Sequence, residues 1–270
     1  MLRTEKRTKS FNVIMEEFNS IKELVDTSDN RKNNFGYNRE FSQRWAGVKN
    51  YDQARDYLLN GWSEPIKDVK NYLDKIDQNK RLDARKTRLK DDIAGFLPIV
   101  PNALMGLPKS MRNVEIVTKK SKVLNVTIDT TYNAGVSKSE AQEYFSKVFA
   151  HLMALEKSGF RIRINSMMCF GNPSEDTVHI VKLLLKHEYQ PIDIKKLMFP
   201  IINTAMLRAV GFDWYERLPD AVEIGGYGRA LHHWHSTKEQ EIYDLMGIDK
   251  SKSFYIHYNS NYRQIFKGAK

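Results

Sequence analysis

The chain has little cysteine, no long hydrophobic run and no complete catalytic motif. Cys169 is the only cysteine in 270 residues, which excludes an intrachain disulfide and a zinc site built from cysteines. No apolar run reaches the roughly 20 residues that a membrane-spanning helix needs. The charged stretch from Met1 to Arg7 lacks the apolar segment of a signal peptide. We therefore expect a protein of a reducing cytoplasm with no membrane partner.

Several signatures of enzymes are missing as well. The glycine-rich stretch from Gly225 to Arg229 lacks the Gly-Lys-Ser/Thr of a Walker A loop and does not match a dinucleotide-binding fingerprint. No nucleophile elbow or protein-kinase motif set is present, and Cys169 has no histidine partner in a recognisable motif. These absences favour a non-enzymatic binding protein, with a metal-dependent hydrolase or nuclease as the alternative.

Positive charge is abundant. The formal net charge is +10, which favours a polyanionic partner, most commonly nucleic acid; the other interpretation is a generally basic protein. The densest basic run, from Asn79 to Lys90, has few apolar positions, so we predict a solvated helix or an exposed connector there. Its candidate phosphate-binding residues are Lys80, Arg81, Arg85, Lys86, Arg88 and Lys90.

The clearest structural pattern is a strand–loop–helix–strand unit. The β-branched run from Val123 to Ile128 predicts a buried strand, and Ser137-x-x-Glu140 is a capping box that begins a helix. Gly159 ends this helix, and the next strand begins at Phe160. Residues 177–185 predict a further strand, antiparallel to the preceding one because only a short turn joins them. A ligand site of such a sheet is expected beyond the first strand, near Asp129.

The rest of the chain divides into two regions before this unit. Residues 1–34 are polar, with a helical spacing of apolar residues between Phe11 and Leu24. Residues 35–112 are predicted to be helical with a proline- and glycine-rich connector, and residues 113–270 to form the α/β domain. The connector, from Asp91 to Pro108, contains three prolines and two glycines that exclude long regular structure. Its apolar content predicts that it packs against the rest of the protein.

The predicted order strand, helix, strand, antiparallel strand, helix, strand, helix, strand resembles a von Willebrand factor A-type (vWA) domain. This resemblance implies a Rossmann-like, mostly parallel sheet flanked by helices. It also implies a Mg²⁺ site in the loop after the first strand, where Asp129, Thr131 and Asn133 occupy the ligand positions of a degenerate metal-ion-dependent adhesion motif. The alternative is that Asp129 accepts hydrogen bonds from the following turn.

A second resemblance covers roughly residues 41 to 216. Its motifs include Trp45-x-Gly47-Val48, Gly106-x-Pro108-x-x-Met111 and Met206-Leu207-Arg208-x-x-Gly211-Phe212. Together they resemble a family of uncharacterised proteins from tailed bacteriophages. The resemblance implies a phage protein of the host cytoplasm, and it implies no activity, because that family has none assigned. From the charge and the missing catalytic motifs we expect binding of nucleic acid or of a phage or host protein, and a virion or assembly component stays open.

A histidine cluster is the remaining candidate site. His232-His233-x-His235 offers imidazole groups, which are common metal ligands. On a helix only His232 and His235 share a face, and no zinc-type spacing is present. We therefore favour partly exposed histidines at the start of a helix over a metal site.

Overall fold

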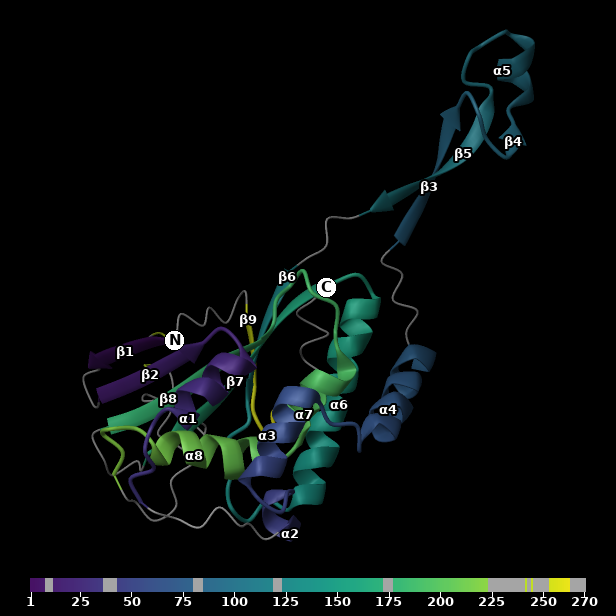
Figure 1. Cartoon of the computed structure of the whole chain (residues 1–270). Helices are drawn as coiled ribbons and strands as arrows, with labels where there is room; N and C mark the ends of the chain where they lie inside the picture. The colour runs from purple at the N-terminus through teal and green to yellow at the C-terminus, as the bar shows by residue number, and fades with distance from the viewer. Residues whose placement is uncertain are drawn as a thin grey trace.

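The computed structural model describes residues 1–7, 12–35, 43–79, 85–118, 123–171, 177–222, 241, 244 and 253–262. Two parts are apparent in it, an α/β body and a projecting segment of residues 85–118 that we call the arm (Figure 1). None of the helices described is both long enough and apolar enough to span a membrane.

A six-stranded mixed sheet forms the centre of the body. Its strands, in spatial order, are β1 (Leu2–Arg7), β2 (Asn12–Phe18), β8 (Thr177–Lys186), β7 (Arg161–Phe170), β6 (Val123–Asp129) and β9 (Ser253–Ile256). The pairs β2–β8, β6–β7 and β6–β9 are parallel, whereas β1–β2 and β7–β8 are antiparallel. The α/β class expected from the sequence is therefore confirmed, in the form of a mixed sheet.

Helices gather on one side of this sheet (Figure 1). They are α1 (Ile21–Asp29), α2 (Gln43–Ala46), α3 (Tyr51–Asn60), α4 (Ile66–Asn79), α6 (Lys138–Lys157), α7 (Ile194–Ile202), the π-helix η1 (Met206–Gly211) and α8 (Phe212–Glu216). Leu124, Val126 and Ile128 of β6 point toward them and belong to one continuous buried hydrophobic cluster. The alternate residues of β6, including Asn125 and Thr127, therefore lie on the opposite face of the sheet.

The strand–helix–strand unit of the sequence forms as predicted. Ser137 caps α6 by accepting a hydrogen bond from the backbone amide of Glu140 at 3.2 Å, and the Glu140 carboxylate accepts one in return from the Ser137 amide at 2.9 Å. Gly159 follows the helix with a φ of 92°, the left-handed conformation that favours glycine. The antiparallel pairing of β8 with β7 is also confirmed.

The N-terminal region differs from its prediction. The apolar spacing between Phe11 and Leu24 predicts a helix, but residues 12–18 form strand β2 and α1 begins only at Ile21. Short apolar runs do not distinguish a helix from a strand. Here the strand is selected by pairing with β8, which lies much further along the chain (Met15 is opposite Ile180).

The arm is a small three-stranded sheet with a helical tip. It consists of β3 (Arg85–Asp92), β4 (Leu97–Pro98), α5 (Val100–Leu104) and β5 (Met111–Thr118), with β5 in the middle. Gly95 lets the chain pass close to β5, because a Cβ atom there would lie 2.0 Å from the Arg112 carbonyl oxygen. The Phe96 amide donates a hydrogen bond to that oxygen at 3.0 Å.

Two expectations about the arm are wrong. The basic run predicts a helix or connector, but residues 85–92 form a strand that pairs with β5. The connector is expected to pack against the rest of the protein, but Ile93 and Leu104 are 72% and 83% exposed. Apolar content indicates that a segment is stabilised when its side chains are buried. It does not indicate whether the burying surface belongs to the same chain or to another molecule. Residue 113, the expected domain boundary, lies inside β5.

Candidate functional site

The loop after β6 is where the sequence predicts a ligand site. Asp129 is fully buried, and its carboxylate accepts hydrogen bonds from the Thr131 amide at 2.8 Å and from the Tyr255 hydroxyl. The Thr131 hydroxyl is buried and accepts a hydrogen bond from the Cys169 amide at 2.9 Å. Asn133 is exposed. Asp129 therefore acts here as a hydrogen-bond acceptor that shapes the turn and ties β6 to β9.

This arrangement does not fit a magnesium site. Hard cations need several oxygen ligands around one open position, whereas Asp129 and Thr131 are enclosed and Asn133 faces solvent. In the part of the chain that the structure describes, no cluster of three or more His, Cys, Asp or Glu residues is placed to hold a metal. Burial raises the pKa of Asp129 above its usual value, despite the hydrogen bonds from Thr131 and Tyr255.

Replacing Asp129 by asparagine tests the two interpretations. Because the folded-state pKa is raised, an ionised Asp129 costs stability, and this cost appears as the pH rises through the folded-state pKa. The asparagine side chain keeps an acceptor for the Thr131 amide without the charge, so we expect an equal or higher melting temperature at pH 7 and a smaller change with pH. Thermal unfolding between pH 4 and 8, with and without Mg²⁺, measures this. Stabilisation of the natural protein by Mg²⁺ that is lost in Asp129→Asn would instead establish a metal site.

A buried arginine holds the same loop from the other side. Arg208, on η1, is 1% exposed and donates hydrogen bonds to the carbonyl oxygens of Trp45 at 2.6 Å and Val136 at 2.6 Å. Its guanidinium lies 4.7 Å from the Trp45 ring centre and 5.2 Å from that of Tyr132. Arg208 thus joins helix α2 to the loop after β6. The sequence motif contains this arginine, but nothing in the motif indicates this role.

A second buried polar cluster connects the N-terminal strands to α8. Glu16 of β2 has no exposed surface, and its carboxylate accepts hydrogen bonds from Arg31 at 2.7 and 2.9 Å and from the Trp214 indole at 2.9 Å. Nearby, the His179 ring lies 3.0 Å from the Asp220 carboxylate. Burial lowers the pKa of His179, and Asp220 offsets this only in part. Sequence reasoning missed this cluster, because its members are distant along the chain.

The arm carries the largest set of exposed apolar side chains. Of fourteen exposed large hydrophobic residues in the described chain, nine lie in the arm: Leu89, Ile93, Phe96, Leu97, Val100, Leu104, Met105, Leu107 and Val114. No residue described between 88 and 115 has a buried side chain. The tip is nevertheless an ordered turn, since the Asn102 carbonyl accepts from the Leu107 amide at 2.9 Å and the Asn102 side chain donates to the Lys109 carbonyl at 3.0 Å. The arm therefore presents a folded apolar surface without a core of its own.

The predicted phosphate-binding residues are only partly assembled on the arm. Arg85, Lys86, Arg88 and Lys90 lie on β3, whereas Lys80 and Arg81 fall outside the described residues. Arg88 and Lys90 are exposed and share one face of the strand. On the other face, Leu89 is opposite Val114 of β5. Arg88 and Lys90 therefore lie on one face of β3 and Leu89 lies on the other, which also carries the Asp91–Arg112 pair.

Other candidates of the sequence cannot be placed. The histidine cluster, His232, His233 and His235, and the glycine-rich stretch from residue 225 to 229 lie outside the residues that the structure describes. Cys169 is buried in β7, as predicted. Burial raises the pKa of its thiol well above the ordinary value, so it is not activated as a nucleophile.

One family model, described as a domain of unknown function (DUF7192), matches residues 3–267. No curated protein matches the chain significantly, and no solved structure does so either. The matched range includes both the body and the arm.

Proposed function

We propose that this chain, which belongs to the family described as a domain of unknown function (DUF7192), is a non-enzymatic binding protein. The arm is its binding element, and the α/β body is the platform that carries the arm. One observation carries the proposal: exposed apolar side chains are concentrated on a folded segment in which no described side chain is buried. Exposed apolar patches of this kind mark interaction surfaces.

The energetics of the arm support a protein partner. A small sheet without a hydrophobic core is only marginally stable in water. Covering side chains such as Ile93, Phe96 and Leu104 would stabilise the arm and supply binding energy at the same time, at about 25 cal/mol per Å² of apolar surface. The arm therefore has the properties of an element that is completed by its partner.

The chemistry of the partner follows from the charges beside the exposed apolar side chains of the arm. Lys90 lies 3.8 Å from Asp92, and Arg112 lies 4.0 Å from Asp91, so these cations are already partly neutralised. Arg88 and Lys109 have no such ion pair within the described residues. An apolar groove with an acidic rim on another protein complements this surface, because opposite charges steer association.

Substitution at the tip is the direct test. The triple variant Ile93→Ser, Phe96→Ser and Leu104→Ser should lose its partner, with at least a tenfold rise in Kd for each side chain that fills a pocket. The free energy of unfolding should change by less than about 0.5 kcal/mol per site, because these residues are exposed. A protein captured from cell extract by the natural chain is identified, purified and titrated calorimetrically against both proteins.

A matched control removes exposed apolar side chains from the body. Leu2→Ser, Tyr189→Ser and Val222→Ser replace residues of similar exposure and should leave the Kd unchanged. Equal binding by the arm variant would contradict the proposal. A purified natural chain that self-associates, while the arm variant stays monomeric, would contradict the heterologous partner and assign the surface to a second copy, as in an assembly component.

Nucleic acid is the second candidate partner. The observation that favours it is the net charge of +10 together with Arg88 and Lys90 on one exposed face of the arm. Cations of this kind bind phosphates without reading sequence, and the binding weakens with salt. If nuclease treatment of the extract abolishes recovery of the partner, and Arg88→Gln with Lys90→Gln does the same, nucleic acid replaces the protein partner.

The finer fold is also a proposal. We propose a vWA-like arrangement, supported by the order β8–β7–β6–β9, in which β6 pairs in parallel with β7 and β9, and β8 is antiparallel to β7. The phage origin and the location in a host cytoplasm stay predictions from sequence resemblance. For the hydrolase alternative, Asp129 is enclosed, and the histidine cluster, its other candidate site, lies outside the described residues.

A further inference from the structure

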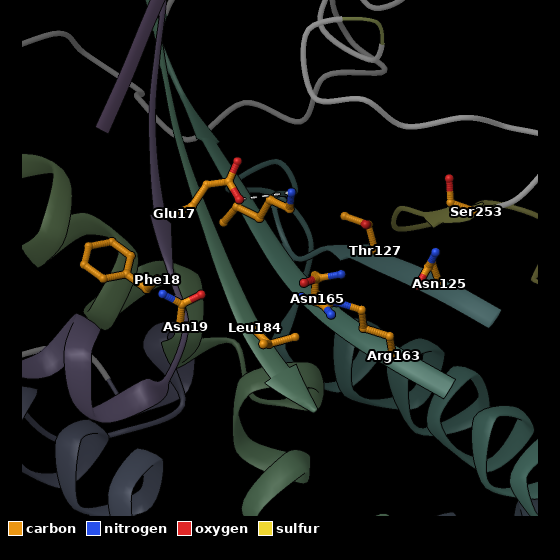
Figure 2. Close-up of a pocket in the computed structure, with 10 residues that line it drawn as sticks. Glu17, Phe18, Asn19, Asn125, Thr127, Arg163, Asn165, Leu184 and Ser253 are labelled. Atoms are coloured by element: carbon orange, nitrogen blue, oxygen red, sulfur yellow. Dashed lines mark hydrogen bonds and ion pairs between the residues drawn. The ribbon is translucent and has the colours of Figure 1, made fainter. Parts of the chain in front are cut away.

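A pocket lies on the face of the sheet that is turned away from the helices (Figure 2). Its volume is about 330 Å³. The lining side chains come from five neighbouring strands or their ends and are Glu17, Phe18, Asn19, Asn125, Thr127, Arg163, Asn165, Lys182, Leu184 and Ser253. Strand register brings the central ones together, because Asn125 is opposite Arg163 and Thr127 is opposite Asn165. Figure 2 shows Asn125, Thr127 and Asn165 on adjacent strands.

The polarity of this face changes sharply along the same strands. Toward the end of β6, the face carries Met167, Cys169 and Ile180, all fully buried. One step back along the strands, the paired positions are Thr127 and Asn165, although asparagine is disfavoured in the centre of a sheet. Polar residues are expected on a strand face that is open to water. Thr127 and Asn165 are nearly buried, however, with 5% and 9% of their surface exposed.

The polar atoms of these two residues are unused within the described chain. The hydrogen bonds of the described residues include none from the side chain of Thr127 or Asn165, and neither is among the residues with further interactions. Neither residue is among those with a fully enclosed, unpartnered side-chain atom, so their polar atoms reach the pocket that both residues line. A molecule in the pocket can therefore take their hydrogen bonds.

The charges identify the kind of molecule. Lys182 is held by Glu17 at 3.3 Å, whereas Arg163 lies 3.7 Å from Glu188, too far for a hydrogen bond. Glu188 therefore offsets part of the Arg163 charge, but the N–H groups of Arg163 make no hydrogen bond within the described residues. A guanidinium matches the oxygens of phosphate or carboxylate groups. Amide and hydroxyl groups supply both donors and acceptors for hydroxyl groups.

Among the described residues, the pocket offers no platform for stacking a base. Phe18 is the one aromatic residue in this described lining, and it is 2% exposed within the helix-covered hydrophobic cluster. Figure 2 shows its ring directed away from Asn125 and Thr127. Single-stranded nucleic acids are usually held by stacking on exposed aromatic rings. We infer that the pocket binds a small polyhydroxylated molecule with an anionic group, with Arg163 on the anion and Asn165 and Thr127 on hydroxyl groups.

Binding of defined probes tests this inference on the full chain. Ribose 5-phosphate and gluconate carry the two forms of the anion, and ribitol is the neutral comparison. We expect one of the two anions to raise the melting temperature and to bind calorimetrically at millimolar concentration or below, with ribitol at least tenfold weaker. The anion that binds distinguishes a phosphate from a carboxylate ligand. Failure of both anions, or equal binding of ribitol, would overturn the inference.

Matched variants separate a binding role from a structural one. Asn165→Leu keeps the approximate shape of the side chain and removes its unpaired polar atoms, so the protein should melt at an equal or higher temperature while binding weakens at least tenfold. Arg163→Gln should weaken binding of the anion similarly, whereas Arg161→Gln, an exposed arginine outside the lining, should not. A lower melting temperature of Asn165→Leu with unchanged binding would show that Asn165 is structural and would end the proposal.

Discussion

Glu16→Ala lowers the free energy of unfolding by about 3–5 kcal/mol, the range seen when one partner of a buried ion pair is removed. The carboxylate of Glu16 is fully enclosed and accepts three hydrogen bonds of 2.7–2.9 Å, two from Arg31 and one from the Trp214 indole. A fourth contact, from Arg3, is 3.4 Å long. Without the carboxylate, the Arg31 charge and the buried indole N–H lose their acceptor, which costs more than the hydrogen bonds contributed.

Urea denaturation at pH 7 measures the effect of this change. Glu17→Ala is the matched control, because the next residue along β2 lies on the opposite face of the sheet and makes a partly exposed ion pair with Lys182 at 3.3 Å. Such a pair is worth about 0–1 kcal/mol. Glu16→Gln should fall between the two, since the amide keeps one acceptor. A loss below about 1 kcal/mol for Glu16→Ala would mean that this cluster does not hold β2 to α8.

Arg208→Met lowers the free energy of unfolding by about 2–4 kcal/mol, because two partly buried carbonyl groups lose their hydrogen bonds at about 1–3 kcal/mol each. These are the carbonyls of Trp45 and Val136. Methionine keeps an apolar stem in the site but loses the attraction between the guanidinium and the Trp45 and Tyr132 rings. The substitution also removes a charge whose burial is unfavourable, because burial lowers the pKa of Arg208. This offsets part of the loss in the free energy of unfolding.

The loop after β6 is the second readout for Arg208. Because Arg208 fastens this loop through Val136 and Tyr132, limited proteolysis of Arg208→Met should cut faster between residues 132 and 137. Arg161→Met, which changes an exposed arginine, controls for the loss of a positive charge and should leave both stability and cleavage unchanged. Unchanged cleavage in Arg208→Met, together with a stability loss, would assign the arginine to the Trp45 side alone.

The elements predicted correctly are those whose signals are local. The capping box from Ser137 to Glu140, the left-handed Gly159 and the β-branched run of β6 each specify their own conformation within a few residues. Strand β2 has the apolar spacing of a helix, and its pairing with β8 depends on residues far along the chain. Strand β3 is a charged run without distinctive periodicity, so β5 decides its conformation.

The candidate sites follow the same division. The sequence places Asp129 correctly at the end of the first strand of the unit, since strand ends are locally encoded. It could not show that the carboxylate is enclosed, because Tyr255, which donates a hydrogen bond to it, lies 126 residues further along. The polar pocket was missed for a similar reason. Asn125, Thr127, Arg163 and Asn165 are ordinary residues until strand register brings them together.

The amino-acid sequence by itself determined the α/β character, the strand–helix–strand unit, the positive charge and the absence of a long apolar run. The tertiary structure alone decided which apolar residues are covered, since burial depends on what packs against a segment and not on its composition. In the folded protein the end of β6 is buried, whereas Ile93 and Leu104 of the arm are exposed. That difference in cover is the physical reason for proposing that the arm binds a partner and that Asp129 has a structural role.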